Sequence, residues 1–262
     1  MLLKTNVDIP IDSIKINFDT EGLWILNIAL AIIMFGVALS IKIDDFKRLI
    51  KKPKILLVGV FSQFFLLPAL TFVAILIIKP HPSFALGMMM IAACPGGNIS
   101  NFFSKMAKGN SALSVSLTAF ATVICLLMTP LNLQFYSRLY EPTNEIIKTV
   151  QLDPIELFKL VLLILGIPIV MGMLLNHYFE EISKKIETLL KPFSIIVFLA
   201  LIVIAFYDNL DVFLNYIHLV AGLVIFHNIG AYFIGFYTAK TFGLEKRDRK
   251  TISMETGIQN GG

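Results

Sequence analysis

Long apolar runs, separated by short charged segments, form the main pattern of the chain. About 20 consecutive apolar residues can cross the hydrocarbon core of a bilayer as a helix. We interpret as membrane spans the runs Leu23–Ile41, Ile55–Ile78, Phe84–Met106, Ser111–Phe135, Ile155–Leu175, Phe193–Tyr207 and Tyr216–Ala239. They predict an all-α, polytopic membrane protein, with residues 1–22 as an N-terminal tail and residues 23–262 as one membrane domain.

The third run contains the least apolar stretch of any span, Cys94-Pro95-Gly96-Gly97-Asn98-Ile99-Ser100-Asn101. Its proline removes a backbone donor, and its glycines loosen the backbone. A helix broken at membrane depth is tolerated only where protein or water covers the exposed backbone, and such breaks point to the binding sites of secondary transporters. A plain loop or re-entrant turn between two helices is the alternative that these eight residues leave open.

Hydroxyl side chains recur along the fourth run at helical spacing. Ser111, Ser114, Thr118 and Thr122 follow one another at intervals of three, four and four residues, which places them on one face of a helix. Such a stripe has two interpretations. It lets helices pack closely, or it lines a cavity and coordinates an ion.

Composition supports a membrane protein. Hydrophobic residues make up 56% of the chain and charged residues 15%, against about 25% charged in soluble domains. If the N-terminus lies outside and every run crosses, sixteen Lys and Arg face the cytoplasm and five face outside, which agrees with the positive-inside rule. No zinc spacing, phosphate loop or nucleotide fingerprint is present, and we predict the lipid bilayer as a partner and no nucleic acid.

The last twelve residues contain an isolated acid, Glu255, after a basic segment that ends at Lys250. A carboxylate at mid-bilayer costs about 2.5–3.5 kcal/mol or more and usually marks an ion or substrate path. The same residues are also compatible with a solvated tail, because a stretch of this length does not establish a span.

Two stretches resemble signatures of the sodium/bile acid cotransporter (bile acid:sodium symporter) family. The first is Cys94–Asn101, with Gly109-Asn110 and the pair Ser114 and Thr118 after it; the second is Arg249–Asn260, which is closest to animal members. The resemblance implies two inverted repeats, each with a broken helix, and the two breaks cross near the membrane centre. It also implies a core, made of the second, third, fourth, seventh and last spans, that moves against a panel of the first, fifth and sixth.

The resemblance also implies the binding residues. One sodium site would use Ser100, Asn101, Ser114, Thr118 and Glu255, and a second would use Gln63, Glu255, Thr256, the carbonyl of Ile258 and Gln259. Asn260 matches a position that lines the substrate cavity. Na+ is a hard cation that prefers oxygen ligands, and each of these groups supplies one. In isolation, Gln63 is better explained by a bond to a neighbouring helix.

The function expected from this resemblance is sodium-coupled symport of bile salts or related amphipathic organic anions by alternating access, with two coupling Na+ ions. We expect a multi-pass protein of the plasma membrane, N-terminus outside, without catalytic or cofactor-binding residues. The chain ends inside what the family would continue as a helix, so we expect a C-terminally incomplete domain. The alternative is a truncated, non-transporting membrane protein or regulatory isoform. An intramembrane enzyme is disfavoured, because Asp208 and Asp211 share a short loop and no Ser/His pair is placed for catalysis.

Overall fold

A computed structural model describes residues 20–149, 159 and 162–260, and these residues are almost entirely helical. The elements are α1 (Thr20–Ala38), α2 (Ile43–Ile50), α3 (Pro53–Phe61), η2 (Ser62–Leu66), α4 (Leu67–Ile78), α5 (Pro82–Ala93), α6 (Asn98–Met106), α7 (Ser111–Leu139), α8 (Glu141–Thr149), η3 (Leu162–Gly166), α10 (Ile167–Tyr178), α11 (Glu180–Asp208), α12 (Leu210–Thr241) and α13 (Lys246–Gly257). The predicted all-α class is therefore confirmed.

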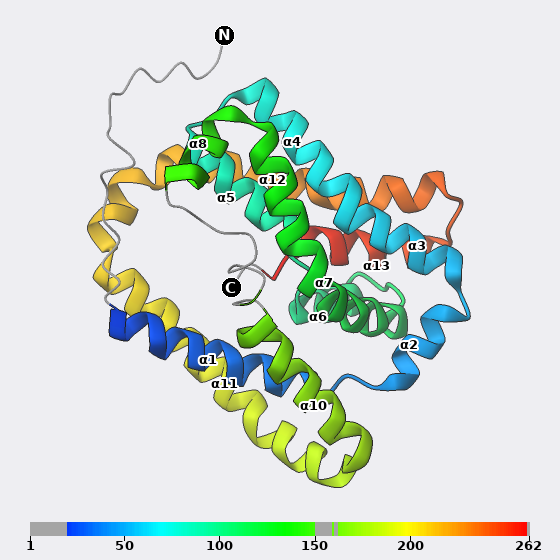
Figure 1. Ribbon diagram of the computed structural model, residues 1–262. Coiled ribbons are helices and arrows are strands. Elements are labelled where there is room, and N and C mark those ends of the chain that lie inside the picture. The colour runs from blue at the N-terminus through cyan, green and yellow to red at the C-terminus, as the bar shows by residue number, and fades with distance from the viewer. Residues whose placement is uncertain (1–19, 150–158, 160–161, 261–262) are drawn as a thin grey trace.

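The helices divide into the two groups that the family resemblance implied. α1, α10 and α11 pack on one another, and Figure 1 shows them together on one side of the molecule. α3 to α7, α12 and α13 pack among themselves as the core. A cluster of buried side chains, which includes Met34, Ala119 and Ile169, joins α1 and α10 to α7 across the boundary.

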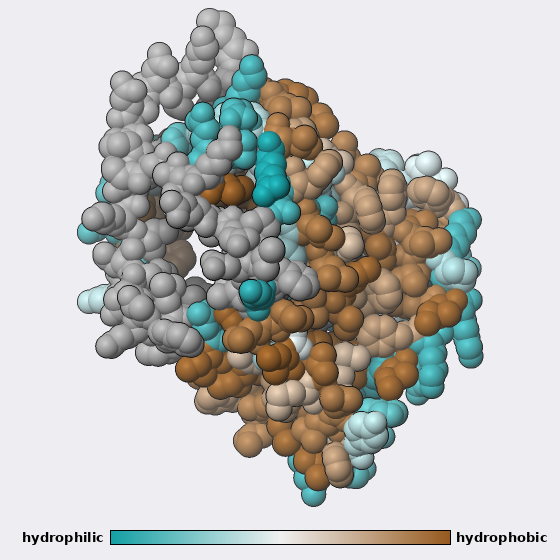
Figure 2. Space-filling model, in the orientation of Figure 1, coloured by the Kyte–Doolittle hydropathy of each residue, from teal (hydrophilic) through white to brown (hydrophobic). Residues whose placement is uncertain are grey.

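Apolar side chains cover much of the face that Figure 2 shows. Within the described residues, three helical stretches are long and apolar enough to cross a membrane: Pro53–Ile78, Ser111–Leu139 and Leu210–Thr241. Asn27–Ala38, Pro82–Ala93 and Leu162–Tyr178 are shorter apolar helices. Exposed leucine, isoleucine and phenylalanine side chains on these helices suit contact with lipid tails. Residues 155–158 and 160–161 of the predicted fifth span, and residues 1–19 of the predicted tail, lie outside the described residues.

Pro68 is accommodated by a change of helix type. The π-helical turn η2 directly precedes α4, in which Pro68 is the second residue. Proline cannot donate to the carbonyl four residues earlier, which belongs to Phe64. Asn132 of α7 fills that role, because its Nδ2 donates to Phe64 O at 2.9 Å. Pro168 follows η3 in the same way. α7 continues as an α-helix through Pro130.

Several segments expected to be loops are helical. The basic segment after the first span contains α2, whose Asp45 accepts the Lys42 N–H at 3.1 Å and whose Leu49 is buried. The segment 136–154 holds the end of α7 and all of α8, and 176–192 holds the first turns of α11. α11 and α12 are separated by a single residue, Asn209. Charged residues favour helices when their neighbours three or four positions away pair with them or pack on the core, so helices extend beyond the apolar runs.

Candidate functional site

The break between α5 and α6 meets the C-terminal end of α13, and we call this meeting point the crossing. α5 ends at Ala93, α6 begins at Asn98, and α13 ends at Gly257. Gly97 N–H donates to Ile258 O at 2.9 Å, and Asn260 N–H donates to Pro95 O at 2.8 Å. An antiparallel bridge pairs Gly96 with Gln259. The α5–α6 break and the residues after α13 therefore satisfy backbone groups that each leaves without a helical partner, as non-helical backbone inside a membrane requires.

Glu255 lies in the last turn of α13, beside this crossing, and is 2% exposed. Its Oε1 accepts hydrogen bonds from Ser100 Oγ of α6 and Ser114 Oγ of α7, both at 2.5 Å. Thr118 Oγ1 lies 3.0 Å from Oε1 and 2.9 Å from Oε2. Within the described residues no cationic side chain pairs with this carboxylate, so hydroxyl groups from two helices are its partners.

The Thr118 hydroxyl group lies near more acceptor oxygens than its single proton can serve. Its Oγ1 lies within hydrogen-bond distance of both Glu255 oxygens, of Asn101 Oδ1 at 3.3 Å and of Ser114 O at 3.0 Å. A hydroxyl group has one proton, so it can donate to only one of these four acceptors at a time. The structure thus brings together all five residues of the first predicted set, and the surplus of acceptors suits a hard cation.

The second predicted set also converges, around Gly96. A Cβ atom at Gly96 would lie 2.7 Å from Glu255 Oε2 and 3.2 Å from Gln63 Nε2, so these side chains flank the glycine on its open side. Gln259 Nε2 donates to the carbonyl of Thr256 at 2.6 Å. The carbonyl of Ile258 already accepts from Gly97 and keeps one further lone pair.

Two buried amide atoms in this set have no partner among the described residues: Gln63 Nε2 and Gln259 Oε1. Leaving a buried polar atom without a partner costs about 1–3 kcal/mol. Gln259 Oε1 is an oxygen of the kind that Na+ binds, whereas the nitrogen of Gln63 is not. Because amide oxygen and nitrogen assignments are interchangeable by a flip, Gln63 presents an oxygen at the same position when its amide is rotated.

The sequence reasoning did not identify Ser62 or Thr129 as neighbours of these residues. Ser62 Oγ lies 3.1 Å from Thr256 Oγ1, and both side chains are fully buried. Thr129 of α7 donates to Ala93 O at 2.7 Å and so satisfies a carbonyl at the end of α5. The sequence signal that could have identified Ser62 is its position next to Gln63. Nothing in the local sequence indicates that Thr129 reaches a helix 36 residues away.

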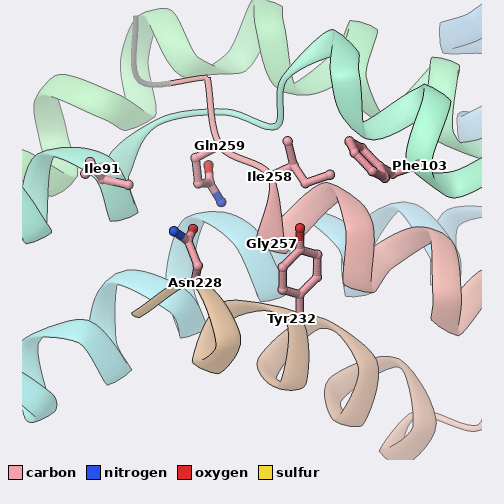
Figure 3. A pocket seen from close by; sticks show the side chains of 7 residues that line it. All are labelled: Ile91, Phe103, Asn228, Tyr232, Gly257, Ile258 and Gln259. Atoms are coloured by element: carbon pink, nitrogen blue, oxygen red, sulfur yellow. The ribbon is translucent and has the colours of Figure 1, made fainter. Parts of the chain in front are cut away.

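A pocket of about 520 Å³ lies beside the crossing. Figure 3 shows Asn228 and Gln259 extending toward one another across it, while the ring of Tyr232 stands beside Gly257. Ile91, Phe103 and Ile258 supply apolar walls. Asn260, predicted to line a substrate cavity, is not among the residues that line this pocket, although it lies at the crossing and is partly exposed.

Comparison with known proteins places the chain in a family. Residues 27–216 match the model of the Sodium Bile acid symporter family. The chain is 31% identical to the uncharacterized sodium-dependent transporter YocS of Bacillus subtilis over 94% of its length and 75% of that protein. It is 30% identical to the human ileal sodium/bile acid cotransporter over 90% of its length and 66% of that protein. It is 27% identical to the probable sodium/metabolite cotransporter BASS1, chloroplastic, of Arabidopsis thaliana, over 89% of its length and 56% of that protein.

These relatives are membrane transporters and not enzymes, as expected from the sequence. The chain spans between about half and three quarters of the length of these three relatives. With an all-α fold and apolar helices long enough to cross a bilayer, the chain belongs to the sodium bile acid symporter family of multi-pass membrane transporters.

Proposed function

We propose that this protein couples the entry of Na+ to the uptake of a bile salt or a related amphipathic organic anion. The observation that carries the proposal is the buried Glu255 carboxylate, which accepts hydrogen bonds from Ser100, Ser114 and Thr118 and stands next to an excess of oxygen acceptors. A carboxylate with no cationic partner is costly inside a membrane. A bound Na+ offsets that cost, so ion binding and the geometry of the crossing depend on one another.

Two Na+ ions fit the arrangement better than one. The first group, around Thr118, offers the oxygens of Asn101 and Glu255; the second, beside Gly96, offers Gln259 Oε1 and Gln63. Glu255 contributes one carboxylate oxygen toward each group, because Oε1 receives the serine hydroxyls while Oε2 lies beside Gly96. Sharing a single charge in this way makes occupancy of the two sites interdependent.

The organic anion binds where the crossing meets open space. The start of α6 points backbone N–H groups and the positive end of its dipole toward the crossing, which suits a negatively charged group. Asn260 lies there and is partly exposed. Apolar side chains of the pocket, such as Ile91 and Phe103, suit the hydrocarbon part of an amphipathic molecule. Movement of the core against the α1, α10 and α11 panel gives alternating access.

The energetics of two-ion coupling are adequate. At about −100 mV inside, one entering Na+ releases about 2.3 kcal/mol, and a tenfold gradient adds about 1.4 kcal/mol. Two ions supply about 7 kcal/mol, and a monoanion costs about 2.3 kcal/mol against the field. The remainder, about 5 kcal/mol, supports an accumulation of about a thousandfold or more. We place the protein in the plasma membrane with its N-terminus outside, which puts the basic connections in the cytoplasm.

Sodium binding tests the core of the proposal. We expect NaCl, but not KCl or choline chloride, to raise the thermal midpoint of the purified chain. A ligand present at 100 times its Kd adds about 2.7 kcal/mol of stability. Glu255→Gln keeps the shape of the side chain but removes its charge, and should abolish the Na+ effect. A sodium response that survives in Glu255→Gln contradicts the assignment.

Uptake tests the coupling. In proteoliposomes, we expect an inward Na+ gradient to drive accumulation of a labelled bile salt, and Asn101→Ala to reduce it strongly. Sodium-independent uptake contradicts symport. Sodium binding with no uptake of bile salts or other organic anions contradicts the transport proposal and favours a non-transporting membrane protein of the same fold.

A further inference from the structure

A second pocket, of about 390 Å³, lies away from the crossing, where connections between core helices meet. We call it the basic pocket, and the residues that carry the argument are Lys52, Lys54, Asn110, Gly243, Arg247 and Asp248. They come from the starts of α3, α7 and α13 and from the turn between α12 and α13. Figure 2 shows hydrophilic residues along the right margin, where Figure 1 places the turn from α2 into α3.

The charge of the basic pocket is not balanced internally. Lys52 and Lys54 are exposed and form no ion pair within the described part of the chain, and Arg247 makes only a long contact, 3.5 Å, to Gly109 O. On the acidic side, Asp248 is buried and already accepts Asn110 Nδ2 at 2.8 Å. Glu245 lies exposed at the rim. Three cationic side chains thus face the pocket against two carboxylates, and one of these carboxylates is buried and hydrogen-bonded to Asn110.

The helix ends around the pocket add to the positive potential. α3, α7 and α13 all begin there, with Lys52, Asn110 and Glu245 as their N-cap residues. Asn110 caps α7 by accepting Leu113 N–H, whereas no side chain caps α3 or α13. Uncapped N–H groups and helix dipoles favour anions, and phosphate groups in particular. The helix ends therefore add to the attraction for anions that the cationic side chains of the pocket already provide.

The walls of the pocket are held in place. Gly243 closes α12 with φ +70°, a conformation that side-chain-bearing residues rarely adopt, and Leu244 N–H returns to Ala239 O at 3.0 Å. Lys250 Nζ donates to Ala107 O at 2.7 Å. Lys54 Nζ lies 4.0 Å from the Cβ position of Gly243, an ordinary van der Waals distance that places the ammonium group beside this turn.

An apolar surface adjoins the pocket. Leu57 and Phe61 of α3 are exposed, and the ring of Phe61 meets that of Phe242, which directly precedes Gly243, with centroids 6.4 Å apart. Exposed aromatic and aliphatic side chains of this kind suit acyl chains. A ligand that has a phosphate group and hydrocarbon chains therefore finds matching chemistry over a continuous surface.

We propose that the basic pocket binds the phosphate group of an anionic phospholipid, at the membrane face that carries the basic connections. The phosphate chemistry is shared with free inorganic phosphate, which lacks the acyl chains that would lie along Phe61 and Phe242. A bound phosphate group joins the starts of α3, α7 and α13. Because α13 carries Glu255, the lipid stabilises the helix on which the candidate sodium site depends. This proposal does not rest on the identity of the transported anion.

The experiment compares ligands in neutral detergent micelles at constant ionic strength, without Na+. The probes are dioleoyl phosphatidylglycerol, dioleoyl phosphatidylcholine and potassium phosphate, with thermal midpoint and retained lipid in native mass spectrometry as readouts. The pocket variant is Lys52→Gln, Lys54→Gln and Arg247→Gln combined. The matched control removes the same number of charges at exposed sites outside the pocket: Lys47→Gln, Lys105→Gln and Lys185→Gln. A third variant, Lys52→Arg with Lys54→Arg, keeps the charge.

We expect phosphatidylglycerol to raise the midpoint of the wild-type chain, the control and the arginine variant, and phosphatidylcholine to have no effect. The pocket variant should bind phosphatidylglycerol about tenfold or more weakly, since each basic residue near an anionic surface contributes about 1 kcal/mol. Equal stabilisation by potassium phosphate assigns the site to free phosphate. Equal loss in the control, or unchanged binding in the pocket variant, overturns the proposal. Unfolding of the pocket variant leaves the wild-type and arginine comparisons to decide it.

Discussion

At the scale of single residues, the candidate sodium site depends on which buried hydroxyls face Glu255. Ser114 and Ser116 lie two positions apart on α7, and both are buried. Ser114 Oγ donates to Glu255, whereas Ser116 Oγ has no partner among the described residues. Helical geometry turns the two side chains about 200° apart around the axis, so only one can point at the crossing.

This contrast gives a matched pair of substitutions. Ser114→Ala should weaken Na+ binding about tenfold, because it removes a hydrogen bond to a charged group. Ser116→Ala should leave Na+ affinity unchanged and slightly raise stability, since it removes an unpaired buried hydroxyl. Sodium titration of the thermal midpoint measures both. Equal losses in the two variants would show that α7 packing, and not the hydroxyl of Ser114, governs binding.

Gln63 tests the number of ions. It flanks Gly96 on the side of Glu255 Oε2 and belongs to the second predicted set only. Gln63→Leu should lower the Hill coefficient of Na+ binding from near two toward one, with the first group intact. Sodium dependence of the midpoint, fitted over a wide concentration range, provides the measurement. A Hill coefficient near one in the wild-type chain would remove the case for a second ion.

At the scale of helices, side chains of α7 complete the hydrogen bonds that broken and proline-containing helices leave open. Asn132 donates a hydrogen bond to Phe64 O, in η2, and Thr129 donates one to Ala93 O, at the end of α5. Gln63 neighbours Phe64, so the position of its amide depends on the same π-helical turn. α7 thus supplies both the hydroxyls of the candidate site and the bonds that hold its neighbouring helices.

Substitution of Asn132 tests this supporting role. Asn132→Leu keeps the size of the side chain and leaves Phe64 O unpaired, which should cost about 1–3 kcal/mol of unfolding free energy. Asn144→Leu is the control, because the Asn144 side chain forms, among the described residues, only a long, exposed contact, 3.4 Å, to Glu141. Unfolding in mixed detergent micelles reports the difference. Equal stability of the two variants would mean that another group or water serves Phe64.

At the scale of the whole molecule, one exposed ion pair links α11 of the panel to the connection that leads into the core. Lys42 Nζ lies 2.9 Å from Glu180 Oε1, and both side chains are about half exposed. Lys42 is the N-cap residue of α2 and Glu180 is the first residue of α11, so both lie outside the apolar stretches. The hydrogen bond from Lys42 lowers the pKa of Glu180, with Lys184 adding to the effect, and the hydrogen bond to Glu180 raises the pKa of Lys42.

The signs of these shifts fix the pH window of the pair. The lowered pKa of Glu180 gives a stabilisation that is present above the unfolded pKa and is lost as pH falls through the folded pKa. The raised pKa of Lys42 gives a stabilisation that is present below the unfolded pKa of this lysine and is lost as pH rises through its folded pKa. A double-mutant cycle with Lys42→Gln and Glu180→Gln should therefore show a small coupling at neutral pH that disappears in acid and in concentrated KCl. Coupling that persists in acid contradicts this account.

Much of the architecture follows from local pattern. Apolar run length predicted the spans, and the Pro-Gly-Gly run predicted the break between α5 and α6, since both are properties of adjacent residues. The helical extensions α2 and α8 and the start of α11 were missed, because their charged residues resemble loops when packing is unknown. The start of α11 is stabilised by a contact such as that of Ser183 Oγ, which donates to Leu39 O at 3.2 Å and so joins residues 144 positions apart.

The sequence by itself determined that this chain is a helical membrane protein with an interrupted third span, a hydroxyl stripe on the next helix and an unexplained acid near residue 255. Those features depend on periodicity and composition over short windows. The family resemblance implied that Glu255 and Ser114 share a site, but only the tertiary structure shows the hydrogen bond between them, 141 residues apart, and the three helices that begin around one basic pocket. The physical reason is that the role of a buried carboxylate, or of a group of cations, depends on the groups packed against it. Packing between distant segments produces no periodic pattern in the sequence.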